Sequence, residues 1–438
     1  MANHRKERLV AKLFLEGTLT NTTQLSIGSG TSENADQDII RLNDKPYIPG
    51  SSLAGSIKSL LEEFGHHPNE HFWGNEDHDN PFKSHAFFDN CLLSSNGFEI
   101  DILDGIKIDP VSNQTQKGAK YDYEVLQPGA LFAFRIEVSV HELMNAQSML
   151  EELQFIKQLM LDEELQLGSC TTAGLGYVKP EHIDIYVYDF IDDENAFDEY
   201  FNYLTVNEHS IEPISKTGPA LSGSPVLQVF GNFKIKSRLI TAQDPEAEDT
   251  DHIQLNRKKG SEFYLTGKSI KGAIHHRMIK IENTLGLNGL VKNLFGFVEE
   301  RKVLEGEQAR KARIFTRETV LQSSQAVLQM RNKIDRFSGG TIDQALFSSM
   351  PAEMHEDQSF LIQVKIKEPQ THEVFLLLQV MKDLMISDMA IGGEKNVGRG
   401  ILEGLSLQAE YNGEKLIFEN GKFAQIDEYF KELSYEPF

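Results

Sequence analysis

The chain has 438 residues, of which 40% are hydrophobic and 25% are charged, which argues against wholesale disorder and predicts two or three domains. The net charge of −23 argues against a free-standing nucleic-acid binder, because phosphate contacts need Lys and Arg. Two cysteines, Cys91 and Cys170, exclude a disulfide framework. No apolar run reaches the length of a bilayer span, so we expect a cytoplasmic protein with no membrane partner.

The first half of the chain predicts a strand, a helix, a strand, a helix and a glycine-rich loop, in that order. Apolar residues alternate over 9–15 and 132–138, as in half-buried strands. Apolar residues at helical spacing follow a Gly-Ser turn at Gly50, where Ser52 is the expected N-cap, and recur over 149–161. The loop Gly168–Gly176 precedes a short strand near residue 177.

The chain then becomes acidic and afterwards rich in Pro, Ser and Gly, which is typical of a linker. We therefore expect a first domain over 1–187, a linker over 188–222, and a second domain with a C-terminal extension over 223–438.

The same features recur in the second half at offsets of 217 to 228 residues. The repeated features are a strand over 227–235, a turn at Gly267 with Ser269 as N-cap, a strand over 360–366, a helix over 374–386 and the loop 392–400. This order predicts a ferredoxin-like (RRM-like) α+β unit used twice. A fold of this type presents a sheet and loops to single-stranded RNA.

Charge is unevenly distributed along the chain. Residues 301–336 hold nine basic and four acidic side chains, although the whole chain is acidic. This stretch can contact RNA, and a solvated charged surface is the alternative. The glycine loops can bring backbone N–H groups close to phosphates, and helix N-termini favour anions; tight turns and helix caps are the alternatives here.

Several stretches resemble the RAMP superfamily of CRISPR systems, above all the backbone subunits of type III effectors. They are IIRLNDKPYIPGSSLAGSIKSLLE, GIKIDPVSNQTQKGAKYDYEVLQPGALFAFRIEV, RNKIDRFSGGTIDQALFSSMPAE and the two glycine loops. The likeness spans about 9–180 and 226–405. Two such domains in one chain resemble the multidomain subunits of type III-D effectors.

The resemblance implies that each domain binds guide (CRISPR) RNA and that an inserted thumb displaces a base pair of the guide–target duplex. Other RAMP subunits of the effector complex are the implied protein partners. Residues expected to contact RNA are Ser51, Ser52, Lys58, Lys107, Gly174, Gly176, Lys268, Ser269, Lys271, Arg331, Lys333, Arg336, Lys395, Gly398 and Arg399.

The resemblance also implies an endoribonuclease that cleaves complementary target RNA with Mg²⁺ or Mn²⁺. In the first copy Asp36 matches the family's catalytic aspartate and is the expected metal ligand, with Asp38 as fallback. In the second copy Asp251 is the best match and Asp249 the fallback. Asn256 stands there in place of Arg41, which puts the second site in doubt.

Other interpretations remain open, two of them within the same superfamily. The chain could be a scaffold that grips guide RNA and cleaves nothing. It could also process guide RNA with His275 and His276 as acid–base groups. Five histidines over 66–85 could hold zinc, although a polar insertion is favoured there, and the nearby Trp73 is expected in the core.

Overall fold

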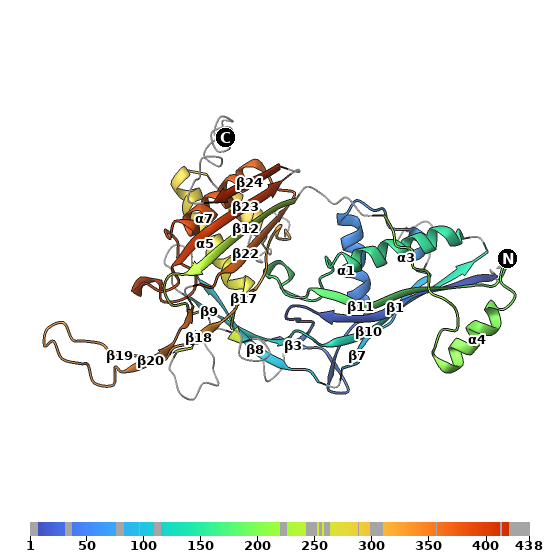
Figure 1. The fold of residues 1–438 in the computed structure, drawn as a ribbon, viewed down its shortest axis with the longest axis horizontal. Coiled ribbons are helices and arrows are strands. Elements are labelled where there is room, and N and C mark those ends of the chain that lie inside the picture. Colours follow the sequence, from blue (N-terminus) through green and yellow to red (C-terminus); the bar gives the residue numbers. More distant parts are fainter. Residues whose placement is uncertain are drawn as a thin grey trace. The chain divides into compact units, whose positions relative to one another are not determined.

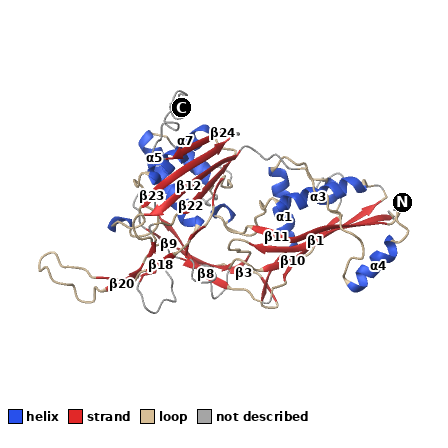
Figure 2. Cartoon of the chain, viewed as in Figure 1, coloured by secondary structure: helices blue, strands red, loops and turns tan. Residues whose placement is uncertain are grey.

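The computed structural model of the chain shows two compact units (Figure 1, Figure 2). The structure describes residues 8–30, 37–75, 83–95, 97–108, 115–142, 144–219, 226–241, 252–253, 256–257, 263–287, 289–297, 310–355, 357–411 and 414–419. Unit 1 comprises Met1–Ile102, Tyr123–Ser169 and Gly176–Ser224, and unit 2 comprises Leu103–Asp122, Cys170–Leu175 and Pro225–Phe438. Two short stretches from the first half of the sequence thus belong to unit 2.

Unit 1 is built on an antiparallel sheet in the order β11-β1-β10-β7-β5-β4, with β6 also paired to β10. Its central strand β1 (Leu9–Asn21) lies between β10 (Leu131–His141) and β11 (Val178–Asp189). The helices α1 (Gly50–Glu63) and α3 (Ala146–Leu161) cover one face of this sheet (Figure 1). This arrangement confirms the ferredoxin-like prediction. That fold places its first strand, here β1, between its third and fourth strands, here β10 and β11.

The remaining elements of this part of the chain are short. They are β2 (Gly28–Gly30), β3 (Asp38–Ile39), β4 (Arg41–Leu42), β5 (Lys45–Ile48), α2 (Glu70–Trp73), β6 (Ala86–Phe88), β7 (Cys91–Leu93), β8 (Ile100–Ile108), β9 (Thr115–Leu126), η1 (Thr171–Ala173) and α4 (Ala196–Val206).

Unit 2 repeats the same order in a five-stranded sheet, β16-β22-β12-β23-β24. Its central strand β12 (Val226–Ile235) pairs antiparallel with β22 (Phe360–Lys367) and β23 (Leu402–Tyr411). The helices α5 (Gly267–Leu285) and α7 (Thr371–Met385) pack on it and share its core.

Smaller elements complete unit 2. They are β13 (His252–Ile253), β14 (Asn256–Arg257), β15 (Phe263–Leu265), α6 (Leu290–Phe295), β16 (Ile314–Thr316), β17 (Thr319–Leu321), β18 (Ser324–Ala326), β19 (Gln329–Arg331), β20 (Phe347–Met350), β21 (Ala352–Met354), η2 (Lys395–Val397) and β24 (Glu414–Glu419).

Both helix starts differ from the predicted N-caps. Helix α1 begins at Gly50 with Pro49 as N-cap, and Ser52 donates its backbone N–H to the Pro49 carbonyl. Helix α5 begins at Gly267, and the side chain of its N-cap Thr266 accepts the backbone N–H of Ser269. Each serine therefore lies inside the first turn, because the residue before each glycine already has the extended backbone that an N-cap needs.

The segment 188–222 is not only a linker. Strand β11 continues to Asp189, and α4 follows at Ala196–Val206 (Figure 2). This helix is amphipathic, since Ala196 and Tyr203 are buried against the sheet. The acidic residues of the segment had suggested a linker instead.

The two glycine loops have the same backbone conformation. Each contains one turn of 3-10 helix between two left-handed residues, Cys170 and Gly174 around η1, and Glu394 and Gly398 around η2. The φ angles are 56° and 89° in the first loop and 53° and 84° in the second. This agreement confirms the repeat at the level of single torsion angles.

Candidate nucleic-acid interface

Only the C-terminal end of the first copy's acidic loop, from residue 37 on, belongs to the described residues. Asp38 lies in β3, which pairs antiparallel with β2, and it is partly exposed. Asp36, Asp249 and Asp251 lie outside the described residues. Of the four candidate catalytic aspartates, the structure therefore places only the first-copy fallback.

The chain directly after Asp36 is fixed by Glu124 of strand β9. The backbone N–H of Glu124 donates to the Gln37 carbonyl at 2.9 Å, and Oε2 of Glu124 accepts the N–H of Ile39 at 2.9 Å. Nη2 of Arg41 donates to both Glu124 carboxylate oxygens at 2.9 Å. Glu124 is buried and Arg41 keeps 31% of its side chain exposed. This arrangement, the Arg41–Glu124 clamp, holds both sides of Asp38.

Sheet register identifies the residues of unit 2 that correspond to the clamp. Leu25 bridges Leu126 in the first copy, and Leu239 bridges Ala352 in the second. Leu126 therefore corresponds to Ala352, and two residues earlier Glu124 corresponds to Met350. The sequence comparison has already matched Asn256 to Arg41. Unit 2 has therefore replaced both members of the clamp.

The first two turns of α1 carry polar side chains and no charged one, and Lys58 follows them. Asn90 caps the helix, since its Oδ1 accepts the N–H of Gly50 at 3.0 Å. Ser51 is exposed, and Ser52 and Lys58 are partly exposed. These three side chains thus occupy positions that fit the predicted RNA contacts.

The start of α5 is engaged within unit 2. Nζ of Lys271 donates to Oγ1 of Thr172 at 2.7 Å, and Nζ of Lys268 lies 3.5 Å from the Tyr121 hydroxyl. Ser269 Oγ accepts from the Thr266 hydroxyl at 3.0 Å. Burial lowers the pKa of Lys271 to about 8. Lys271 therefore lies in a protein contact, in contrast to the exposed phosphate ligand that the sequence suggested.

The first glycine loop is also packed against protein. A Cβ on Gly174 would lie 2.6 Å from the carbonyl oxygen of Thr316, and one on Gly176 would lie 2.0 Å from that of Leu167. Both glycines are buried. In the second loop Gly398 is exposed, with nothing described within 4 Å of such a Cβ, and Lys395 is exposed beside it. Of the two loops, the second has the geometry expected for a phosphate contact.

The hairpin joining β19 to β20 extends from unit 2 (Figure 1). Apolar side chains near its tip are exposed. Phe337 is 100% exposed and Ile334 is 63% exposed. Lys333 and Arg336 beside them are exposed as well. Cations next to unburied apolar side chains are what a hairpin needs to contact phosphates and insert between bases.

Two predicted RNA contacts in this region instead hold the protein together. Arg331 at the hairpin base forms an ion pair with Glu394 and lies over the Phe347 ring at 4.7 Å. Arg399 is buried and pairs with the same carboxylate, with Nη1 2.8 Å from Oε2. Burial lowers the pKa of Arg399. Glu394 thus joins the second glycine loop to the hairpin base, and Arg399 does not match an exposed phosphate ligand.

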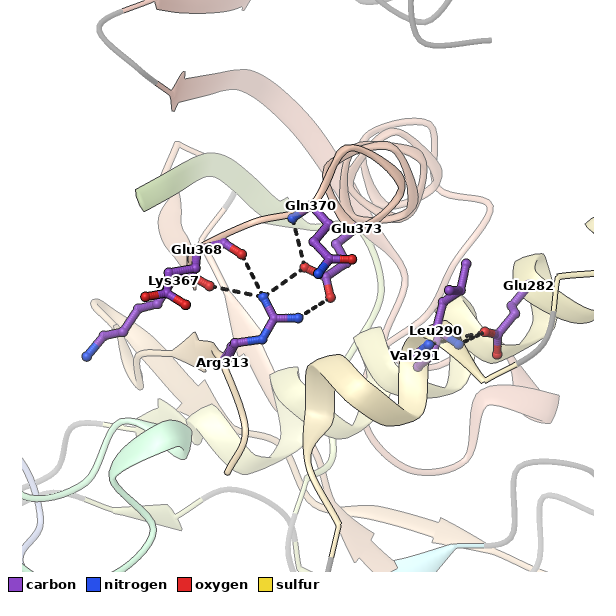
Figure 3. A network of polar contacts seen from close by, with 8 residues as sticks. All are labelled: Glu282, Leu290, Val291, Arg313, Lys367, Glu368, Gln370 and Glu373. Atoms are coloured by element: carbon purple, nitrogen blue, oxygen red, sulfur yellow. Dashed lines mark hydrogen bonds and ion pairs between the residues drawn. The ribbon is translucent and has the colours of Figure 1, made fainter. Parts of the chain in front are cut away.

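Arg313, from the basic stretch 301–336, is structural as well. Its Nη1 donates to the carbonyl of Glu368 at 2.7 Å and to Oε2 of Glu373 at 3.1 Å, next to the start of α7 (Figure 3). Glu282 similarly accepts the N–H groups of Leu290 and Val291 (Figure 3). Arg313 and Arg331 are thus engaged within the protein, and only the other basic residues of 301–336 are candidates for RNA contact. Lys107 lies in strand β8, and its side chain is outside the described residues.

One face of the unit 1 sheet is covered by an aromatic cluster that was not predicted from the sequence. His209 stacks between Tyr186 and Tyr203, with ring centroids 3.6 and 4.1 Å away, and its Nε2 lies 2.9 Å from Oε1 of Glu16. Phe14 packs against Tyr203 at 5.0 Å. This cluster occupies the sheet face on which an RNA-recognition fold stacks bases. The alternation of aromatics along β11 was the available signal.

The histidine candidates do not form a catalytic or metal site among the described residues. Burial lowers the pKa of His275 to about 4, and its ring packs on Phe295 at 4.4 Å. His66 bonds Oε2 of Glu152 at 2.7 Å. Trp73 packs against the core and donates to Oε1 of Glu152 at 2.6 Å, as expected for a core residue. No group of three His, Cys, Asp or Glu side chains suited to a metal occurs within the described ranges.

Comparison with known proteins agrees with the repeat. A family model described as RAMP superfamily matches residues 18–179 and 206–403. The chain is 29% identical over 203 residues to the CRISPR system Cms endoribonuclease Csm3 of Mycobacterium tuberculosis, covering 39% of this chain and 86% of that protein. No helix in the described part of the chain is long and apolar enough to cross a membrane.

Proposed function

Because the chain belongs to the RAMP superfamily, we propose that it is a backbone subunit of a type III CRISPR effector that binds guide RNA and cleaves complementary target RNA. The likeness to a CRISPR endoribonuclease supports the reaction class. The net charge of −23 is compatible with this role if partner subunits complete the RNA groove.

The observation that carries the proposal is the exposed hairpin tip. Ile334 and Phe337 serve no core in the described structure, and Lys333 and Arg336 flank them. Exposed apolar side chains gathered at one place on a protein surface mark an interaction site. Insertion between base pairs uses both the apolar tip and the flanking charge.

Cleavage is assigned to the acidic loop of the first copy. Asp36 would hold Mg²⁺ or Mn²⁺, with Asp38 as the alternative, since carboxylate oxygens are the ligands these hard cations prefer. The metal would stabilise charge on the scissile phosphate. The Arg41–Glu124 clamp would hold the chain that follows this loop. Helix α1 begins shortly afterwards at Gly50, and its N–H groups and dipole favour a guide phosphate.

Unit 2 supports a second role, that of a scaffold without cleavage. Met350 corresponds to Glu124 by sheet register and Asn256 corresponds to Arg41 by sequence, so the second copy lacks both members of the clamp. Asp251 and Asp249 would then hold no catalytic metal, or would hold it in poor geometry.

The test is cleavage of a labelled target RNA by the assembled complex, with divalent metal present or chelated. Asp36→Ala should abolish one cut and leave target binding intact, because phosphate contacts supply most of the affinity. Glu99→Ala is the matched control, as it removes an exposed carboxylate from the same unit. If Asp36→Ala, Asp38→Ala and the double variant all retain every cut, the first domain is a scaffold.

A further inference from the structure

Helix α4 has two apolar faces, and only one of them is covered. Ala196 and Tyr203 are 1% and 3% exposed on the inner face. On the outer face Phe197, Phe201 and Leu204 are 62%, 63% and 59% exposed. Their spacing of four and three residues aligns them in one stripe along the helix.

The helix is held firmly, so the outer stripe is presented in one orientation. Tyr203 packs between Phe14 and His209, and its hydroxyl accepts a hydrogen bond from Nη1 of Arg135 at 3.2 Å. The Tyr188 hydroxyl lies 2.7 Å from Nδ1 of His209, which follows α4 in the chain. A flexible linker would bury no side chains, whereas this segment contributes Tyr203 and His209 to an aromatic cluster that fixes the position of the helix.

The charge around the stripe decides what can cover it. Residues 189–212 contain eight Asp and Glu side chains and no Lys or Arg. RNA and anionic bilayers are repelled by such a surface. A second copy of this chain would bring the same acidic surface against it, which like-charge repulsion disfavours.

We propose that the outer face of α4 is a docking surface for a different protein subunit, which covers the stripe with an apolar patch rimmed by Lys and Arg. A contiguous exposed apolar stripe on a positioned helix is typical of a protein interaction site. The acidic rim selects the partner by charge and speeds the encounter. This surface consists of other residues than the acidic loop and the hairpin, so the inference goes beyond RNA cleavage.

A photo-crosslinking amino acid at position 201 tests the docking surface in the intact assembly. Cells express the tagged full-length chain together with the complete complex, and after irradiation the purified complex is analysed by mass spectrometry. We expect a crosslink to another protein, on a peptide that combines apolar residues with Lys or Arg. The same amino acid at position 386, a similarly exposed apolar site after α7, should not crosslink to that peptide.

Charge reversal supplies the second measurement. Asp192→Lys, Asp193→Lys and Asp198→Lys together should reduce the crosslink yield at least fivefold, and Asp36→Ala should leave it unchanged. A crosslink to RNA, to a second copy of this chain or to a peptide without basic residues would overturn the proposal. Absence of any crosslink, or a yield unaffected by charge reversal, would overturn it too.

Discussion

Nη2 of Arg41 lies 2.9 Å from each carboxylate oxygen of Glu124, and this ion pair joins two segments that are 83 residues apart in the chain. Glu124 is buried and also accepts the N–H of Ile39. The strand that leaves the acidic loop is therefore held by charge and by backbone contacts together, and the pair can be tested from either side.

Replacing Arg41 by Ala should loosen the acidic loop. The buried Glu124 loses its cation, so we expect a stability loss of about 1–3 kcal/mol. Cleavage at the first site should fall roughly tenfold to a hundredfold, because a small misplacement of a catalytic group is costly. Guide binding should not change. Thermal melting, target cleavage and guide-RNA binding measure the three effects, and unimpaired cleavage in a folded variant would show that the clamp does not position the loop.

Grafting the clamp onto the second copy should raise its activity. The double variant Asn256→Arg and Met350→Glu restores both partners at the register positions that unit 2 has lost. We expect a new or stronger cut that disappears when Asp251 is also replaced by Ala. Each single variant serves as control, since one member alone leaves an unpaired charge. An unaltered cut pattern in the double variant would argue that other features silence this copy.

Charge reversal on the hairpin tip should weaken RNA binding without unfolding unit 2. Lys333→Glu with Arg336→Glu changes exposed side chains only, so the melting temperature should stay within a few degrees. The affinity of the complex for target RNA should fall about tenfold or more, and the salt dependence should become shallower. Lys216→Glu with Lys280→Glu is the matched control, with the same charge change at exposed sites off the hairpin. Equal losses in both variants would mean that only net charge matters.

Glu394→Gln should destabilise unit 2 more than its exposure suggests. Arg331 and Arg399 both pair with this carboxylate, and Arg399 is buried, so the variant leaves two cations without their shared anion. We expect a loss of about 3 kcal/mol by denaturant unfolding. Glu403→Gln removes an exposed carboxylate from β23 and should cost little. Similar losses in the two variants would contradict a structural role for Glu394.

The partly buried amine of Lys271 should give stability a pH dependence. Its pKa is about 8 in the folded chain and 10.5 in the unfolded one, so between these values the unfolded chain binds more protons. The Lys271 contribution to stability therefore rises as pH increases from 8 to 10.5. The melting temperature of the wild type minus that of Lys271→Met should increase across this window. A difference that does not vary with pH would show that the amine is not held in its neutral form.

Much of the fold was predictable because periodicity reports burial directly. The alternation over 9–15 and 360–366 corresponds to β1 and β22, and the turns at Gly50 and Gly267 mark the first residues of α1 and α5. Helix α4 was missed because the acidic stretch 189–199 overlaps its first turn, and because its buried side depends on contact with a distant sheet face.

The candidate interface was predictable in outline and not in detail. The sequence indicated that Arg331 and Arg399 are basic and near RNA-facing loops, but it could not show that Glu394 holds both. Spacing along the chain does not reveal which carboxylate folds back onto which guanidinium. Glu124 was missed for the same reason, since 83 residues separate it from Arg41.

The two glycine loops share one backbone conformation but differ in the side chain at the same left-handed position. Cys170 and Glu394 adopt nearly the same left-handed torsion angles, although one is a small thiol and the other a carboxylate that binds two arginines. The glycines around them fix the path of the chain, which frees this one position to diverge. A chimera that exchanges Cys170 and Glu394 should therefore preserve the course of the backbone in both loops. It should remove the two ion pairs of the second loop without creating them in the first, where Leu175 stands in place of Arg399.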